Sequence, residues 1–174
     1  MKINDKNAIC LAGEFAVLSQ LALLGYDANM TLGHTKGVDI LVSNPRTNRM
    51  CRLEVKTKLR KSDKQVSKSK IFGTAIGGWV MAQKHEAVTD PSIFYCFVII
   101  REAKKKFRFF IIPSRVVARY VREEHRHWLK AKKKEGKKVK PNDMRTLRIG
   151  FRKNKYVIAT PTAEKYEDKW DLGS

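Results

Sequence analysis

The chain has 174 residues, 43% of them hydrophobic, which is enough for one hydrophobic core and too few for two ordinary domains. Its 37 Lys and Arg residues outnumber 17 Asp and Glu residues, giving a formal net charge of +20 and a sequence pI near 10.1. Such a surface indicates a polyanionic partner, and nucleic acid is favoured over a membrane surface. Because no apolar run reaches transmembrane length and residues 1–5 do not begin a signal peptide, we expect a cytoplasmic protein with no membrane partner.

The first predicted element is a helix over residues 7–24. Its apolar residues Leu11, Phe15, Leu18 and Ala22 recur at helical spacing and are expected to face the core, and Gly25 follows where the helix should stop. The cysteines are odd in number and each lies among apolar residues, which predicts buried thiols rather than a disulfide or zinc framework. They are Cys10, Cys51 and Cys96.

A glycine-containing loop at residues 33–37 leads into a predicted strand at residues 38–42. Turn-forming residues at 44–48 and a second strand at residues 50–57 complete an antiparallel hairpin. The polar, lysine-rich residues 56–70 lack an apolar period and are interpreted as a mobile basic loop.

The second half begins with a predicted short helix at residues 79–87. Residues 93–100 form an apolar run without alternation, which predicts a central strand buried on both faces. A strand at residues 107–112 follows, then Pro113 and Ser114 cap a helix that reaches residue 134. Residues 147–151 and 156–159 would form a terminal hairpin. The expected class is α/β, a mixed central sheet flanked by helices in the order αβββαββα.

Asp39, Glu54 and Lys56 form the constellation that carries chemistry. Glu54 and Lys56 share one face of their strand, and a hairpin symmetric about residues 46 and 47 has pairing sums of 93, which places Asp39 opposite Glu54. Two opposed carboxylates repel, and the arrangement becomes useful when Mg²⁺ or Mn²⁺ lies between them. The backbone carbonyl of Val55 would supply another metal ligand.

These residues match a known pattern. Gly37, Val38 and Asp39, followed by Glu54, Val55 and Lys56, resemble the bipartite motif of the PD-(D/E)XK nuclease superfamily, the restriction-endonuclease-like fold. Within it the chain looks most similar to archaeal Holliday junction resolvases, through an early helix carrying Glu14 and a later strand that ends in Ile112 and Pro113 before a helix. Val38 departs from the pattern, because it replaces the proline that names the motif.

The resemblance spans residues 12–121. It divides the chain into a PD-(D/E)XK nuclease-like core, residues 1–135, and a basic and then aromatic C-terminal extension, residues 136–174, packed on the same domain. It implies that Asp39 and Glu54 hold the metal and that Lys56 orients the attacking water, chemistry that phosphodiester hydrolysis itself requires. Glu14 would be the fourth catalytic residue, and the resemblance also suggests a homodimer.

Several residues have two interpretations. Glu14 could be an ordinary boundary residue of an amphipathic helix, and His34 an exposed loop histidine instead of a DNA contact. Gln83, Lys84 and His85 could face the site or simply be surface residues. A zinc site at residues 123–127 is disfavoured because no third well-spaced ligand accompanies it. The basic run at 130–140 is a solvated helix end or a phosphate-binding arm.

The expected function is a metal-dependent DNA endonuclease, structure-selective in the manner of a resolvase. The alternatives are a catalytically inactive nucleic-acid-binding protein on the same fold and an RNA-cleaving member. Candidate phosphate contacts lie in the two polar loops around the site; they are His34, Lys36, Lys58, Arg60, Lys61 and Lys64.

Overall fold

The computed structural model describes residues 5–31, 37–62, 66–102, 105–151 and 157–172. Its first element, α1 (Lys6–Leu23), begins after Asp5, whose side chain accepts a hydrogen bond from the Asn7 amide at 2.9 Å. The face of α1 that packs on the core is Gly13, Val17 and Leu21, at a spacing of four residues. The expectation that Leu11 and Phe15 face the core is wrong, since they are 46% and 53% exposed.

Sheet A is the central sheet, with the strand order β1-β2-β3-β6-β7. Its strands are β1 (Asp27–Met30), β2 (Ile40–Asn44), β3 (Arg49–Arg60), β6 (Ile93–Arg101) and β7 (Lys106–Pro113). The β3–β6 pair is parallel and the other three pairs are antiparallel, so the predicted mixed sheet is confirmed. The predicted register is confirmed too, because Ile40 pairs with Leu53 and Val42 with Cys51.

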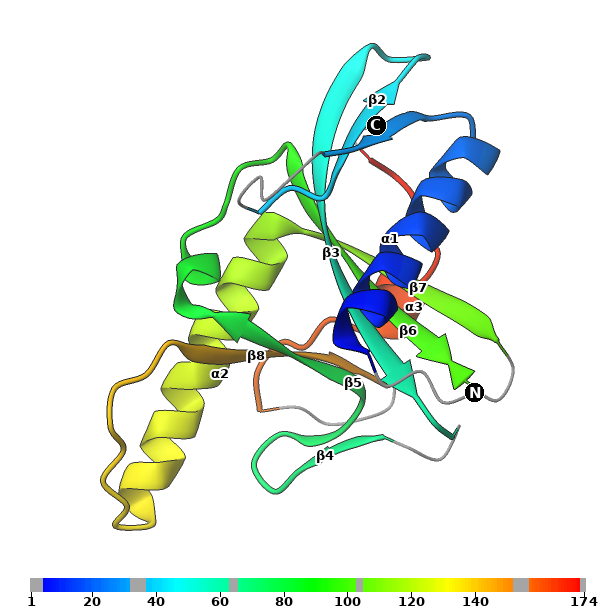
Figure 1. The fold of residues 1–174 in the computed structure, drawn as a ribbon. Helices are drawn as coiled ribbons and strands as arrows, with labels where there is room; N and C mark the ends of the chain where they lie inside the picture. The colour runs from blue at the N-terminus through cyan, green and yellow to red at the C-terminus, as the bar shows by residue number, and fades with distance from the viewer. Residues whose placement is uncertain (1–4, 32–36, 63–65, 103–104, 152–156, 173–174) are drawn as a thin grey trace.

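Sheet B is a smaller antiparallel sheet of β4 (Ser67–Ser69), β5 (Gly73–Ala82) and β8 (Met144–Gly150). The remaining elements are the short 3₁₀ helix η1 (Gln83–Glu86), the long helix α2 (Ser114–Lys134) and α3 (Ala163–Tyr166). In Figure 1, α1 lies on one side of sheet A, and α2 with sheet B lies on the other.

Sheet A separates two hydrophobic clusters, one on each face, because successive residues of a strand point to opposite faces. On β6, Cys96 and Val98 pack toward α1, whereas Tyr95 and Phe97 pack toward α2 and sheet B. The strand is buried from Phe94 to Ile100, which confirms the two-sided burial predicted for it.

Three predicted elements are wrong. Residues 56–60 continue β3 and residues 67–69 form β4, so the predicted basic loop at 56–70 is largely strand. Residues 79–82, predicted as helix, belong to β5, and only 83–86 are helical. β8 pairs with β5, whereas the predicted hairpin partner 156–159 begins at a residue outside the described ones and its described residues 157–159 are not strand. The β5–β8 pairing adds strands that the expected order αβββαββα lacks. Sequence reasoning missed the later part of β5 and its partner β8 because residues 77–82 pair only with β8 among the described strands, more than 60 residues further along the chain.

The chain after residue 135 contributes to both sides of sheet A. β8 lies in the cluster with α2, whereas Leu172 and Trp170 pack into the cluster with α1. The Tyr26 hydroxyl donates a hydrogen bond to the Trp170 carbonyl at 2.8 Å. The division at residue 135 stays a prediction. In the described part of the chain, no helix has the length and hydropathy needed to cross a membrane.

Candidate active site

The site lies at the start of β2, beyond which one edge of β3 has no neighbouring strand among the described residues. The last pair of this ladder is Ile40 with Leu53, and from residue 54 onward the described strands pair with β3 only on the β6 side. Asp39 makes the next hydrogen bonds to this edge of β3. Its amide donates to the Leu53 carbonyl at 2.8 Å, and its carboxylate Oδ2 accepts from the Val55 amide at 2.6 Å. Asp39 therefore occupies a hydrogen-bonding position that a further residue of β2 would otherwise fill.

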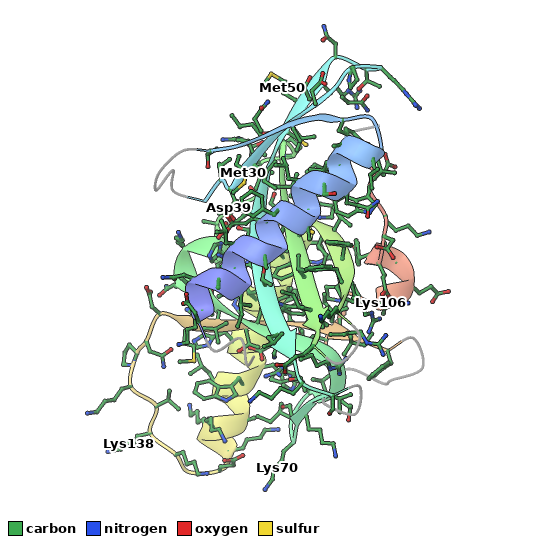
Figure 2. All side chains as sticks on the ribbon, turned by 45° about the vertical axis from the view of Figure 1, so that its right-hand side comes forward. Met30, Asp39, Met50, Lys70, Lys106 and Lys138 are labelled. Carbon is green, nitrogen blue, oxygen red and sulfur yellow. The ribbon has the colours of Figure 1, made fainter. Side chains whose placement is uncertain are left out.

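Helix α1 crosses the same edge of β3. A Cβ atom added at Gly13 would lie 1.9 Å from the Thr57 hydroxyl oxygen, so the close approach of the helix requires glycine there. Gly37, just before the Asp39 segment, has φ of +74°, and a Cβ at that position would lie 3.6 Å from Glu54 Oε2. Figure 2 shows Asp39 close to α1.

Glu54 and Lys56 point from β3 toward sheet B and form an ion pair, with Lys56 Nζ 2.5 Å from Glu54 Oε1. Glu54 is buried, whereas the Lys56 side chain is 32% exposed. They line an open cavity of about 430 Å³, whose other walls come from β5, η1 and the start of β8. The residues in those walls include Ala82, Lys84, His85, Asp143 and Met144.

The carboxylates of the site affect one another. Burial raises the pKa of Asp39, and the Glu54 charge raises it further, while the Val55 amide and the Lys56 ammonium oppose the rise. Burial and the Asp39 charge also raise the pKa of Glu14, and Lys56 opposes the shift. The fold thus brings Glu14, Asp39, Glu54 and Lys56 together from α1, the segment before β2, and β3.

Two further residues join the site: His85, for which the sequence left two interpretations open, and Tyr95, which sequence reasoning did not assign to it. His85 Nδ1 lies 2.7 Å from the Tyr95 hydroxyl and 3.8 Å from Glu54 Oε2, and Tyr95 is the ladder partner of Glu54 on β6. Burial, together with the Glu54 carboxylate, raises the pKa of Tyr95. One weak indication of the role of Tyr95 lies in the sequence, because a tyrosine inside a strand buried on both faces needs a hydrogen-bond partner for its hydroxyl. Its partner could not be identified without the fold.

The residues present fit a hard divalent cation. Asp39 and Glu54 are two neighbouring carboxylates whose mutual repulsion a cation would relieve, and Mg²⁺ commonly uses one or two carboxylates together with water and phosphate oxygens. Within the described ranges, no group of three or more His, Cys, Asp or Glu side chains is arranged to hold a metal. A metal here would therefore rely on backbone, water and substrate oxygens for its other ligands.

The candidate phosphate contacts have mixed positions. His34, Lys36 and Lys64 lie outside the described residues. Lys61 is exposed, but Arg60 is buried and Lys58 is half-buried, with its Nζ donating to the Gly78 carbonyl at 2.8 Å. Burial lowers the pKa of Lys58, helped by Arg60 and Arg148. Arg60 and Lys58 thus pack between β3 and sheet B instead of projecting from a loop.

Other candidate residues have structural roles. Glu124 is buried and pairs with Arg148 at 3.2 Å, which accounts for one acidic residue of the disfavoured zinc group. Cys51 and Cys96 are buried thiols as predicted, but Cys10 is exposed, because it lies on the part of α1 that turns away from the core. Trp79 is buried in the core, in agreement with its β5 position.

No protein-family model matches the chain, and no curated protein matches it. Among solved structures, the chain is similar to a bacterial homing endonuclease, I-Ssp6803I, at 14% sequence identity and a TM-score of 0.48. The similarity covers 98% of this chain and 91% of that chain. At these values the function has to be argued from the residues of the site.

Proposed function

We propose that this protein is a metal-dependent endonuclease that hydrolyses phosphodiester bonds of DNA. The observation that carries the proposal is the meeting of Asp39, Glu54 and Lys56 at the free edge of β3. Two carboxylates and an ammonium group gather there beside an open cavity, in a chain with a net charge of +20. The motif resemblance described above supports the same activity.

In this proposal, Asp39 and Glu54 hold Mg²⁺ or Mn²⁺ together with the Val55 carbonyl. The bound metal would supply an activated water at neutral pH and neutralise charge on the phosphate. Lys56 extends from β3 to the cavity and places a positive charge where the developing phosphorane oxygens need one. Glu14, whose pKa is raised by burial and by Asp39, would be suited to accept a proton from a water bound at the site.

DNA is the proposed substrate because its backbone is the polyanion that a basic surface binds without sequence preference. The cavity is open, and a second open cavity of about 510 Å³ lies beside α2 and shares Asp143 with it. That second cavity extends to Lys140, at the end of the basic run. A resolvase-like preference for branched DNA follows from the family resemblance and belongs to the proposal.

The test is to incubate the purified protein with branched, single-stranded and duplex DNA, and with RNA of the same sequence, in Mg²⁺ or Mn²⁺. The proposal predicts cleavage of DNA that stops when a chelator is added. Cleavage of RNA alone would favour the RNA-cleaving alternative. Salt-sensitive DNA binding without cleavage in either metal would favour a catalytically inactive nucleic-acid-binding protein.

A further inference from the structure

Three buried polar side chains meet behind the proposed metal site. Glu54 and Tyr95 are partners in the parallel β3–β6 ladder, so their side chains project to the same face of sheet A. His85 reaches this face from η1, which follows β5 directly. The exposed fractions of Glu54, Tyr95 and His85 are 5%, 0% and 4%, so the protein must satisfy their polar atoms internally.

The proton positions in this group follow from the chemistry of its members. Burial and the neighbouring Glu54 carboxylate raise the pKa of Tyr95, so its hydroxyl keeps its proton, and because a carboxylate can only accept, that proton is directed to the ladder partner Glu54. That hydroxyl then accepts from His85, whose Nδ1 is 2.7 Å from it and therefore carries the proton. The 3.8 Å between His85 Nδ1 and Glu54 Oε2 is too long for a direct hydrogen bond, so His85 acts on Glu54 through Tyr95. This direction is the same whether the imidazole is neutral or charged.

We propose that Tyr95 and His85 are positioning residues, which hold the Glu54 carboxylate ready for a divalent cation through this two-bond relay. The proposal rests on the proposed function. Lys56 pairs with Glu54 from the cavity side at 2.5 Å, and Tyr95, its ladder partner, lies beside it on the core side. Partners behind a metal ligand fix its orientation before the metal arrives, and their loss commonly weakens metal affinity by roughly 10–100-fold.

The relay has a purely structural alternative, in which Glu54 and His85 merely satisfy a buried tyrosine hydroxyl. Both interpretations predict some loss of stability when the hydroxyl is removed, so stability cannot separate them. Metal affinity can. Tyr26→Phe is the control, because it removes a hydroxyl that donates to the Trp170 carbonyl in the cluster on the opposite face of sheet A from Tyr95.

The experiment measures Mn²⁺ binding to the full chain by calorimetry, without DNA, for the wild type, Tyr95→Phe, Tyr26→Phe, His85→Asn and His85→Leu. Tyr95→Phe and His85→Leu should weaken binding by roughly 10-fold or more. Tyr26→Phe should not. His85→Asn should retain most of the affinity, since its amide nitrogen can replace Nδ1 as donor. Unchanged affinity in Tyr95→Phe, with wild-type binding intact, would overturn the relay and leave the proposed function standing.

A second readout is independent of the metal. Nitrogen NMR of the wild type should find the His85 proton on Nδ1. In Tyr95→Phe, the imidazole should no longer be held in this tautomer. A neutral ring protonated only at Nε2 would overturn the relay directly. Wild-type protein that binds no Mn²⁺ would refute the proposed function, and with it the positioning role of Tyr95 and His85.

Discussion

The carboxylate of Asp39 accepts a 2.6 Å hydrogen bond from the amide of Val55, the residue between Glu54 and Lys56. This bond ties the segment before β2 to the centre of the motif on β3. It fixes Asp39 beside Glu54 although the β2 ladder reaches only to Ile40, one residue away. Asp39 thus accepts a hydrogen bond from the β3 backbone in addition to its proposed role as a metal ligand.

The stability of the metal-free protein should depend on pH through Asp39. Burial raises the pKa of Asp39, assisted by Glu54, so the folded state binds the proton more tightly than the unfolded state. The free energy of unfolding of the wild type, relative to Asp39→Asn, should therefore fall as pH rises above the ordinary aspartate pKa, about 4. Urea unfolding of both proteins in chelator, from about pH 4 to 7, measures the difference. A wild type that gains stability over the variant as pH rises would contradict the assigned electrostatics.

Gly13→Ala should destabilise the protein by about 1–3 kcal/mol and reduce cleavage, because the added methyl group collides with Thr57 and pushes α1 away from β3. Thr57→Ala removes the nearest atom and should restore part of the loss. Thermal melting and cleavage rates of the two single variants and the double variant check this. Additive losses would show that the two residues do not press on each other.

Exposed lysines at the end of α2 and in the loop after it should contribute to DNA binding. Neutralising Lys133, Lys134, Lys138 and Lys140 should weaken affinity for all sequences and flatten its salt dependence, by about 0.9 in logarithmic slope for each phosphate that is no longer neutralised. Figure 2 shows Lys138 on the loop after α2, at the end of the molecule opposite Met50. Titrations at several salt concentrations measure the slope.

The matched control neutralises four exposed lysines on β7, its preceding turn and the C-terminal segment. They are Lys105, Lys106, Lys165 and Lys169. The same decrease in slope for both sets would mean that binding reflects net charge alone. No decrease for the first set would place the binding surface nearer to Lys61, directly after β3.

The outer face of α1 is where we expect two copies of the chain to meet. Leu11 and Phe15 are exposed there, and residues 7–35 contain no Lys or Arg, so this surface lacks the repulsion expected between two highly basic chains. Phe15→Glu should shift sedimentation from dimer to monomer, whereas Val80→Glu, at a residue 70% exposed on β5, should not. A wild-type protein that stays monomeric at every concentration would refute the homodimer.

The sequence predicts the parts of the fold that are set by local interactions. The turn at residues 44–48 determines the β2–β3 register, and that register brings Asp39 to Glu54. The face of α1 was wrongly predicted because the helix is apolar on two sides, so periodicity could not decide which one is buried. The parts set by distant pairing could not be predicted. Residues 77–82 of β5 pair with β8, and His85 reaches Tyr95 because η1 follows β5.

Asp39→Asn is the most direct test of the active site. The substitution keeps an oxygen that can accept from the Val55 amide, so folding and DNA binding should be nearly unchanged. It removes the charge that a hard cation requires, so Mn²⁺ binding and DNA cleavage should be lost. Asp27→Asn, on an exposed residue of β1, is the control and should cleave like the wild type.

The decisive measurement is the rate of Mg²⁺-dependent DNA cleavage by Asp39→Asn, taken beside its melting temperature. We predict no detectable cleavage and a melting temperature in metal-free buffer equal to or above that of the wild type, because removing one of two repelling carboxylates gains about 0.2–1 kcal/mol. Cleavage by Asp39→Asn at the wild-type rate, together with a marked fall in its melting temperature, would contradict this prediction. Asp39 would then serve only to complete the hydrogen bonding of β3.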